Sequence, residues 1–295
     1  MEQTNLLNET ALIFEGGGMR ASYTSGMVVA LLEADIHAPF VAGISAGASN
    51  TANYLSRDAP RARSSFTDFA ADPNFGDWRT FLRGKGLFHS EYIYEHAGLP
   101  VMPLEYNWEA FQQHPADFRI GGFDIGSGDT VWWGRDDTPE MGDLMRRVRA
   151  SSTMPIVMPP VPINGRTYVD GALGTDGGIP ISIAEELGYE RFLVVLTRER
   201  SYQKAPEKFP RFYLAYFRKY PAVADALLTR WWRYNQTREK LFELQRAGKA
   251  YLFTPEIMPV ANGERNVQKL NAAHELGLAQ ARREMPAIQE FLGLS

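Results

Sequence analysis

The sequence predicts an α/β fold, a three-layer α/β/α sandwich around a mainly parallel sheet. Residues 11–55 alternate twice between an apolar run, a tight turn and a helical pattern, as do strands joined by crossover helices. The composition is that of an ordinary folded protein, since 44% of the 295 residues are hydrophobic and 22% are charged. A chain of this length forms one large domain or two smaller ones.

In the first half of the chain, the elements follow from apolar periodicity. Strands are predicted at 11–14 and 40–44, each followed by a helix, at 21–32 and 46–55. Residues 57–115 are polar, aromatic and interrupted by Pro and Gly, so only a short helix near 90–96 is predicted there. A hairpin is predicted from 118–125 and 130–133, followed by a helix at 139–150.

The second half is predicted by the same criteria. A strand at 167–169 leads into Asp170, and a helix at 181–187 precedes a strand at 192–197. Residues 209–245 have a helical pattern interrupted at Pro221. A late strand at 251–254 and two helices, at 266–284 and 286–292, complete the prediction.

Charge and cysteine content exclude several classes of function. The 31 Lys and Arg against 35 Asp and Glu give a formal net charge of −4, without the basic excess of a nucleic-acid-binding protein. The absence of cysteine excludes disulfides, thiol nucleophiles and Cys-ligated zinc. No signal-peptide pattern and no run of about 18 apolar residues is visible, so we expect a cytoplasmic protein without a transmembrane helix.

The most specific motif is Gly43-Ile44-Ser45-Ala46-Gly47, a G-x-S-x-G between a predicted strand and a predicted helix. A nucleophile on such a sharp turn needs small neighbours, which Gly43 and Gly47 supply. The turn also puts Ser45 at a helix N-terminus, where free N–H groups favour developing negative charge. The motif therefore indicates a nucleophilic serine, although the same pattern also occurs in plain turns.

A second motif, Gly16-Gly17-Gly18-Met19-Arg20, follows the first predicted strand. Successive glycines let backbone N–H groups converge on an anion, so an oxyanion hole is the favoured interpretation. A nucleotide site is disfavoured because neither G-x-G-x-x-G nor Gly-Lys-Ser/Thr is present. Arg20 is either a structural or a phosphate-facing cation.

A nucleophilic Ser45 requires a base. Among the histidines, only His274 completes the order Ser, Asp, His of α/β-hydrolases, but it lies in a predicted helix rather than on a loop. Asp170 ends a predicted strand and precedes Gly171-Ala172, so it is the preferred base if burial brings it close to Ser45. Asp176, which lacks a preceding strand, ranks second among the carboxylates.

In their order and spacing, these pieces resemble the patatin-like phospholipases, especially the bacterial members. The glycine-rich turn, the G-x-S-x-G and Asp170-Gly171-Ala172 carry the resemblance, which covers residues 10–200. The interval from Asp170 to Ile179-Pro180 is slightly longer than is usual in the family, which keeps Asp176 open as a base.

The resemblance implies a patatin-like core that hydrolyses acyl esters of lipids through an acyl-enzyme, without metal or other cofactor. Ser45 would be the nucleophile and Asp170 the base. The oxyanion hole would comprise Gly16, Gly17, Gly18 and Ala46, with Arg20 and Gly171 in supporting roles. Two alternatives stay open: a Ser45–Asp170–His274 esterase or thioesterase, and a non-catalytic lipid-binding protein on the same scaffold.

Residues 1–200 are thus predicted to form the catalytic core, with 57–115 as a lid or insertion, and 201–295 a mainly helical extension packed on it. Residues 209–233 combine aromatic and basic side chains. Such a segment either packs over the sheet or makes a transient contact with a membrane surface. The expected partner is a lipid or acyl-ester substrate, and the oligomeric state stays open.

Overall fold

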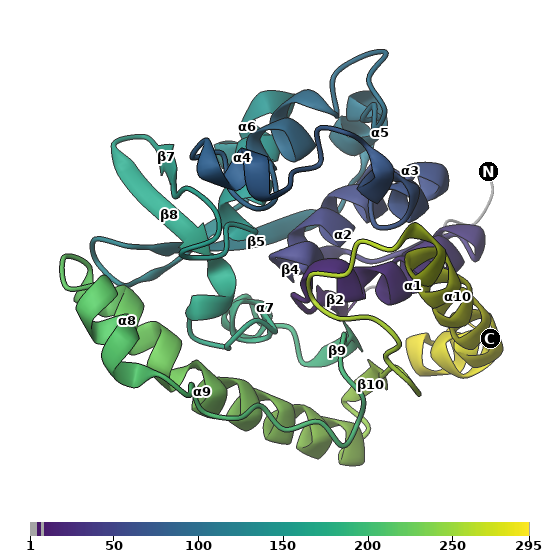
Figure 1. Cartoon of the computed structure of the whole chain (residues 1–295). Helices are drawn as coiled ribbons and strands as arrows, with labels where there is room; N and C mark the ends of the chain where they lie inside the picture. The colour runs from purple at the N-terminus through teal and green to yellow at the C-terminus, as the bar shows by residue number, and fades with distance from the viewer. Residues whose placement is uncertain (1–4, 7–8, 295) are drawn as a thin grey trace.

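The main sheet of the protein has eight strands in a computed structural model that describes residues 5–6 and 9–294 (Figure 1). Along the sheet the order is β10-β9-β2-β4-β5-β8-β7, and β6 pairs with β5. The parallel strands are β2 (Thr10–Phe14), β4 (Phe40–Ile44), β5 (Asp117–Asp124), β9 (Arg191–Val195) and β10 (Ala250–Phe253). The antiparallel strands are β6 (Thr130–Trp133), β7 (Val161–Ile163) and β8 (Arg166–Asp170). The short strands β1 (Asn5–Leu6) and β3 (Ile36–His37) form a separate parallel pair.

Helices cover both faces of the sheet, as alternate residues of β2 demonstrate. Leu12 and Phe14 belong to a buried cluster that includes α1 (Ala21–Glu33), α2 (Ala46–Leu55), α6 (Met141–Ser151) and α10 (Val267–Leu292). Ala11 and Ile13 belong to another cluster, with α7 (Ser182–Glu186) and α9 (Pro221–Arg246). Because successive side chains of a strand point to opposite faces, the two clusters lie on opposite sides of the sheet. The predicted three-layer α/β/α architecture is confirmed.

Residues 57–115 form a set of short helices beside α2 and α6 (Figure 1). They are α3 (Ala59–Ser64), the 3₁₀ turn η2 (Asp68–Ala71), α4 (Trp78–Leu82), the π-type turn η3 (Glu91–His96) and α5 (Trp108–Gln113). Phe69, Phe75 and Phe88 of this region pack in one buried cluster with Met19 of the glycine-rich turn and Leu270 of α10. The region therefore covers the turn after β2, and its lid role stays a prediction.

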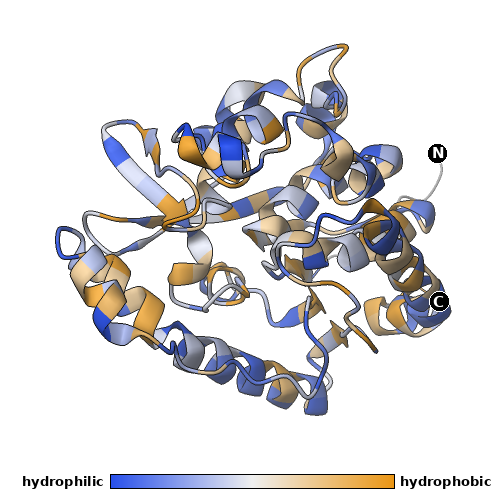
Figure 2. Ribbon diagram, viewed as in Figure 1, coloured by the Kyte–Doolittle hydropathy of each residue, from blue (hydrophilic) through white to orange (hydrophobic). Residues whose placement is uncertain are grey.

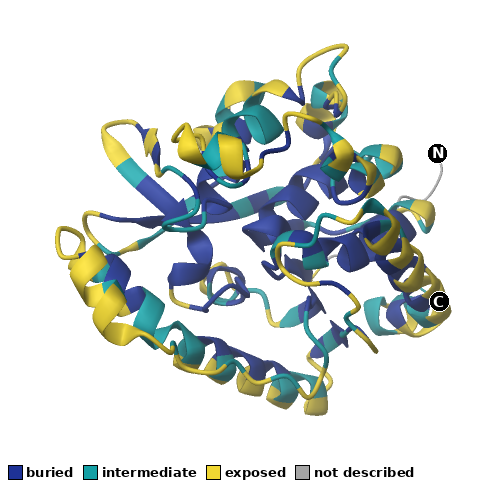
Figure 3. Ribbon diagram, viewed as in Figure 1, coloured by how far each residue is buried: buried dark blue, intermediate teal, exposed yellow. Residues whose placement is uncertain are grey.

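The C-terminal part adds helices on both sides and one strand at the edge of the sheet. Helix α8 (Pro210–Tyr216) is separated from α9 at the predicted break, because Pro221 is the first residue of α9. Helix α8 is exposed, and its surface mixes apolar and charged residues (Figures 2 and 3). Strand β10 pairs with β9, and the division into a core and an extension at residue 200 stays a prediction.

The prediction of two helices at 266–284 and 286–292 is wrong, because α10 runs through Pro286 without interruption. A proline inside a helix removes one backbone hydrogen bond and usually kinks or ends the helix. Here Met285 and Ile288, on either side of the proline, are buried in the core. The packing of this apolar face against the core outweighs the local cost of the proline. Sequence periodicity does not include tertiary packing, so it could not predict this outcome.

Candidate active site

Ser45 and Asp170 meet because β4 and β8 end at adjacent positions along β5. Ile44 pairs with Gly121, and Asp170 pairs with Gly122. Strand β6 pairs with the same two glycines, so it occupies the other edge of β5, and β4 and β8 must share one edge and run toward each other. The Ser45 Oγ then donates a hydrogen bond of 2.8 Å to Asp170 Oδ2.

The backbone of Ser45 is strained. Its φ of 58° and ψ of −126° lie in a region that residues with a Cβ seldom occupy. Both glycines of the motif are needed at this turn, since a Cβ on Gly47 would lie 2.2 Å from the Phe14 carbonyl oxygen and one on Gly43 would lie 2.2 Å from that of Gly47. The turn thus has the geometry of a nucleophile elbow, with Ser45 at the start of α2.

Ser151, at the end of α6, fixes this turn. Its Oγ accepts the Ser45 N–H at 2.9 Å and donates to the Gly121 carbonyl at 2.5 Å. All three residues lie in the buried interior. Sequence reasoning gave Ser151 no role of its own, because only the fold brings residue 151 next to residues 45 and 121.

The glycine-rich turn after β2 presents free N–H groups beside Ser45. The Gly16 N–H donates to the Gly178 carbonyl at 3.0 Å and is therefore already engaged. The N–H groups of Gly17, Gly18 and Ala46 have no hydrogen-bond partner among residues 5–6 and 9–294. Three of the four predicted oxyanion donors are thus available, whereas Gly16 has a structural bond.

Glu15, immediately before the glycines, anchors this turn to the rest of the molecule. Its buried carboxylate accepts the Thr197 N–H at 2.5 Å and the Tyr234 hydroxyl at 2.7 Å. Glu15 follows β2, Thr197 follows β9 and Tyr234 lies on α9. The Glu15 side chain therefore joins the ends of β2 and β9 to helix α9. The Thr197 hydroxyl also donates to the Gly16 carbonyl at 3.0 Å.

Burial raises the pKa of Asp170, which strengthens the carboxylate as a base. Smaller effects oppose it: the Ala172 N–H donates to Oδ1 at 2.9 Å, and both the charge of Arg230 and the Ser45 hydrogen bond favour the ionised form. Gly171 permits the tight turn after the strand, because a Cβ there would lie 2.1 Å from the Gly121 carbonyl oxygen.

The structure places the two alternative bases elsewhere. His274 is buried on α10, where its Nδ1 shares a hydrogen bond of 2.8 Å with the Ser25 hydroxyl of α1. Burial lowers the pKa of His274 to about 4. The Asp176 Oδ2 accepts both the N–H and the hydroxyl of Ser182, at 3.0 and 2.7 Å. Neither side chain lines a cavity beside Ser45.

Ser45 lies between two cavities of opposite character. One, of about 210 Å³, is polar and is lined by Arg20, Ser45, Asp170 and the glycine-rich turn. Glu15 also lines it. Sequence reasoning did not find six further polar lining residues, all from the last third of the chain: Arg198, Tyr202, Lys204, Arg230, Tyr234 and Asn262. The other, of about 70 Å³, is mostly apolar and is lined by residues that include Met19, Phe66, Phe75, Phe88, Ile93 and Met158.

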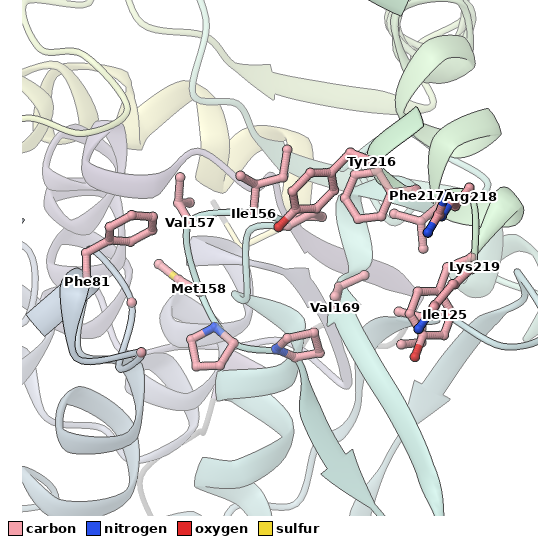
Figure 4. Close-up of a pocket in the computed structure, with 17 residues that line it drawn as sticks. Phe81, Ile125, Ile156, Val157, Met158, Val169, Tyr216, Phe217, Arg218 and Lys219 are labelled. Atoms are coloured by element: carbon pink, nitrogen blue, oxygen red, sulfur yellow. The ribbon is translucent and has the colours of Figure 1, made fainter. Parts of the chain in front are cut away.

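A larger groove, of about 500 Å³, lies between α4 and the C-terminal end of α8 (Figure 4). Phe81 and Met158 line one part of it, and Tyr216, Phe217 and Arg218 line another. Because Met158 also lines the apolar cavity beside Ser45, the two spaces adjoin at this side chain. Met158 thus forms a wall that is common to the groove and the apolar cavity.

A family model described as "Patatin-like phospholipase" matches residues 12–184, which is more than half of the chain. The chain belongs to the patatin-like phospholipase family. The family is one of lipid acyl hydrolases, and the match spans the patatin-like glycine-rich turn, the Ser45 elbow and Asp170. A second model, described as a domain of unknown function (DUF6363), matches residues 220–293, from α9 to the end of α10.

Two known proteins are similar to this patatin-like chain. The uncharacterized protein YjjU of Escherichia coli (strain K12) is 28% identical over 211 residues, which cover 68% of this chain and 55% of YjjU. The chain thus spans about half the length of this curated relative. VipD from Legionella pneumophila has a similar crystal structure, with a TM-score of 0.50 and 11% identity over 95% of this chain and 67% of VipD. At that identity, the likeness concerns the fold alone.

Across the described residues, none of the helices combines the length and the apolar character that a membrane crossing requires.

We expect Ser151→Ala to lower the free energy of unfolding by about 1–3 kcal/mol, because the Ser45 N–H and the Gly121 carbonyl would stay buried without their partner. Urea denaturation measures the difference. Ser22→Ala is the matched control, since the buried Ser22 hydroxyl has no hydrogen-bond partner among the described residues. Equal losses in the two variants would contradict the role of Ser151.

Proposed function

We propose that the protein hydrolyses fatty-acyl esters of lipids through a Ser45–Asp170 dyad and an acyl-enzyme. The observation that carries the proposal is the 2.8 Å hydrogen bond from Ser45 Oγ to Asp170 Oδ2, on a strained turn beside free backbone N–H groups. Membership of the patatin-like family supports a lipid acyl ester as the substrate.

In the first half-reaction, Ser45 Oγ attacks the ester carbonyl and its proton passes to Asp170 Oδ2. The negative charge that develops on the carbonyl oxygen accepts hydrogen bonds from the N–H groups of Gly17, Gly18 and Ala46. Asp170 then returns the proton to the departing alcohol, which leaves the acyl group bound to Ser45 as an ester.

In the second half-reaction, Asp170 takes a proton from water, which attacks the acyl carbonyl in the same oxyanion environment. The intermediate collapses, the proton returns to Ser45 Oγ and the fatty acid leaves. The raised pKa of Asp170 supports this role, because a carboxylate with an ordinary pKa is a weak base. His274 bonds to Ser25 and Asp176 bonds to Ser182 instead of to Ser45, so neither is favoured as the base.

Ser45→Ala and Asp170→Asn should each reduce kcat/KM on a short p-nitrophenyl ester by about 10³-fold or more, since each removes a group that acts in bond formation. His274→Asn should retain most of the activity, with folding checked by circular dichroism. A folded His274 variant that is as inactive as Ser45→Ala would replace the dyad with a triad. A wild-type protein inactive on every ester would favour the lipid-binding alternative.

The pH profile offers a separate test of the base. Asp170 must be ionised to accept the Ser45 proton, so kcat/KM should fall as the pH drops through the pKa of Asp170. Burial raises that pKa above 3.8, the ordinary value, so the acid limb should lie above 3.8 and persist in His274→Asn. A limb that disappears in His274→Asn would identify the histidine as the titrating group instead.

We also propose that α8 makes a transient contact with an anionic membrane surface. Phe209 and Phe212 are 71% and 50% exposed, and Leu214 and Tyr216 are exposed too. Arg211 is among the basic residues beside them. Exposed aromatic and basic side chains together suit an interface of apolar chains and anionic headgroups. The groove between α4 and α8 would receive the lipid from that surface (Figure 4).

The double variant Phe209→Ser/Phe212→Ser should bind vesicles of phosphatidylglycerol and phosphatidylcholine about tenfold or more weakly than the wild type, because two apolar side chains no longer insert. Co-sedimentation measures the bound fraction. Ile257→Ser is the matched control, since Ile257 is 56% exposed and lies outside α8 and the groove. Unchanged binding of the double variant would contradict the contact.

The cytoplasmic location expected from the sequence stays a prediction.

A further inference from the structure

The polar cavity beside Ser45 contains an excess of positive charge. Its lining includes four cationic side chains, Arg20, Arg198, Lys204 and Arg230, but only two carboxylates, Glu15 and Asp170. The formal net charge of the lining is therefore +2. Both carboxylates are also engaged elsewhere, Glu15 by Thr197 and Tyr234, and Asp170 by Ser45 and Ala172.

Neutral groups hold these cations in place. The Arg230 Nε donates to the Gly177 carbonyl at 3.0 Å, and the Arg198 guanidinium lies 4.2 Å from the centre of the Tyr202 ring. The Asn235 side-chain amide accepts the Lys204 N–H at 2.9 Å and donates to the Lys204 carbonyl at 3.0 Å.

The positive charge of the cavity is therefore compensated only in part by the described residues. None of the four cations forms an ion pair within residues 5–6 and 9–294, although many other arginines there do. The Arg20 Nε is buried and has no hydrogen-bond partner among the same residues. A site with these buried cations suits an anionic ligand.

The cations also repel one another. The pKa of Lys204 falls to about 8, first because of burial and then because of the charges of Arg230, Arg20 and Arg198, although the charge of Glu207 opposes this shift. Burial and the charge of Arg198 likewise lower the pKa of Arg20. A bound anion relieves this repulsion, and a phosphomonoester, with a charge of about −1.5 to −2 at pH 7, comes close to matching the net charge of the lining.

The position of Ser45 sets the orientation of a substrate. Ser45, Gly18, Met154 and Asn262 line both the cationic and the apolar cavity. An ester carbonyl at Ser45 would then have its acyl chain in the apolar cavity, toward Met158, and its alcohol in the cationic cavity.

We propose that the cationic cavity binds a phosphomonoester on the departing alcohol, so that the preferred substrate is an acyl ester of glycerol phosphate. This inference rests on the proposed lipid hydrolysis at the same site. A zwitterionic choline headgroup fits less well, because its ammonium group would meet the four cations. A neutral glycerol ester leaves their charge uncompensated.

The test compares kcat/KM for lysophosphatidate, lysophosphatidylcholine and monoacylglycerol that carry the same acyl chain. The wild type should prefer lysophosphatidate, and Lys204→Gln and Arg198→Gln should each reduce that preference by about tenfold or more, since each removes a charged hydrogen-bond donor. Lys249→Gln is the matched control, because Lys249 is exposed and pairs only with the exposed Glu190 among the described residues. An equal preference in the Lys204 and Lys249 variants, or no preference in the wild type, would overturn the proposal.

Calorimetry with glycerol 3-phosphate and with inorganic phosphate separates this proposal from the proposed hydrolysis, because binding needs no turnover. Binding of glycerol 3-phosphate that is lost in both Lys204→Gln and Arg198→Gln supports the cavity even if every ester tested is inert. Tighter binding of inorganic phosphate than of glycerol 3-phosphate would identify free phosphate as the ligand and overturn the headgroup assignment. No binding of either would overturn the proposal outright.

Discussion

The site depends on one edge of β5, where two strands that run in opposite directions end against neighbouring glycines. Gly121 and Gly122 receive the last residues of β4 and β8, which brings residues 45 and 170 within one hydrogen bond of each other. A single parallel strand along this edge of β5 would continue past Gly121 without a turn. A single antiparallel strand along the whole edge would leave no space for the turn at Ser45. Ser151 bonds both Ser45 and Gly121 and so fixes the turn after β4 against β5. The strain at Ser45 persists because these contacts leave its backbone no alternative.

Different parts of the chain build the two sides of the nucleophile. The apolar side comes from the glycine-rich turn, the short helices of 57–115 and Met154 and Met158. Apart from Arg20, the cations of the other side come from residues 198–230, beyond the stretch that matches the patatin-like family model. In the proposed reaction, the family core would thus supply the nucleophile and the oxyanion donors, whereas the segment after β9 would supply most of the charge that selects the alcohol.

The parts of the fold and of the site that the sequence could predict are those set by neighbouring residues in the chain. The strand, turn and helix around Ser45 follow from apolar periodicity and two glycines within five residues, and Asp170 follows from its place at a strand end before Gly171. What it could not predict depends on contacts between distant residues. The engagement of the Gly16 N–H by Gly178, the bond from Ser151 and the continuity of α10 through Pro286 are all set by tertiary packing. The charge of the polar cavity is hidden for the same reason, because a chain with a net charge of −4 can still gather four cations at one place.

Arg230 acts on both the proposed base, Asp170, and the proposed headgroup cavity. Its charge favours the ionised form of Asp170 and so works against the burial that raises the pKa of this carboxyl group. The same guanidinium lines the cationic cavity, where a phosphate would offset its field. A bound dianion would then raise the pKa of Asp170, both by screening Arg230 and by its own negative charge. Asp170 would become a stronger base when the cavity is filled than when it is empty. A headgroup that fits would therefore position the ester and also increase the readiness of Asp170 to accept the Ser45 proton, which makes the binding energy of a remote phosphate available to the chemical step.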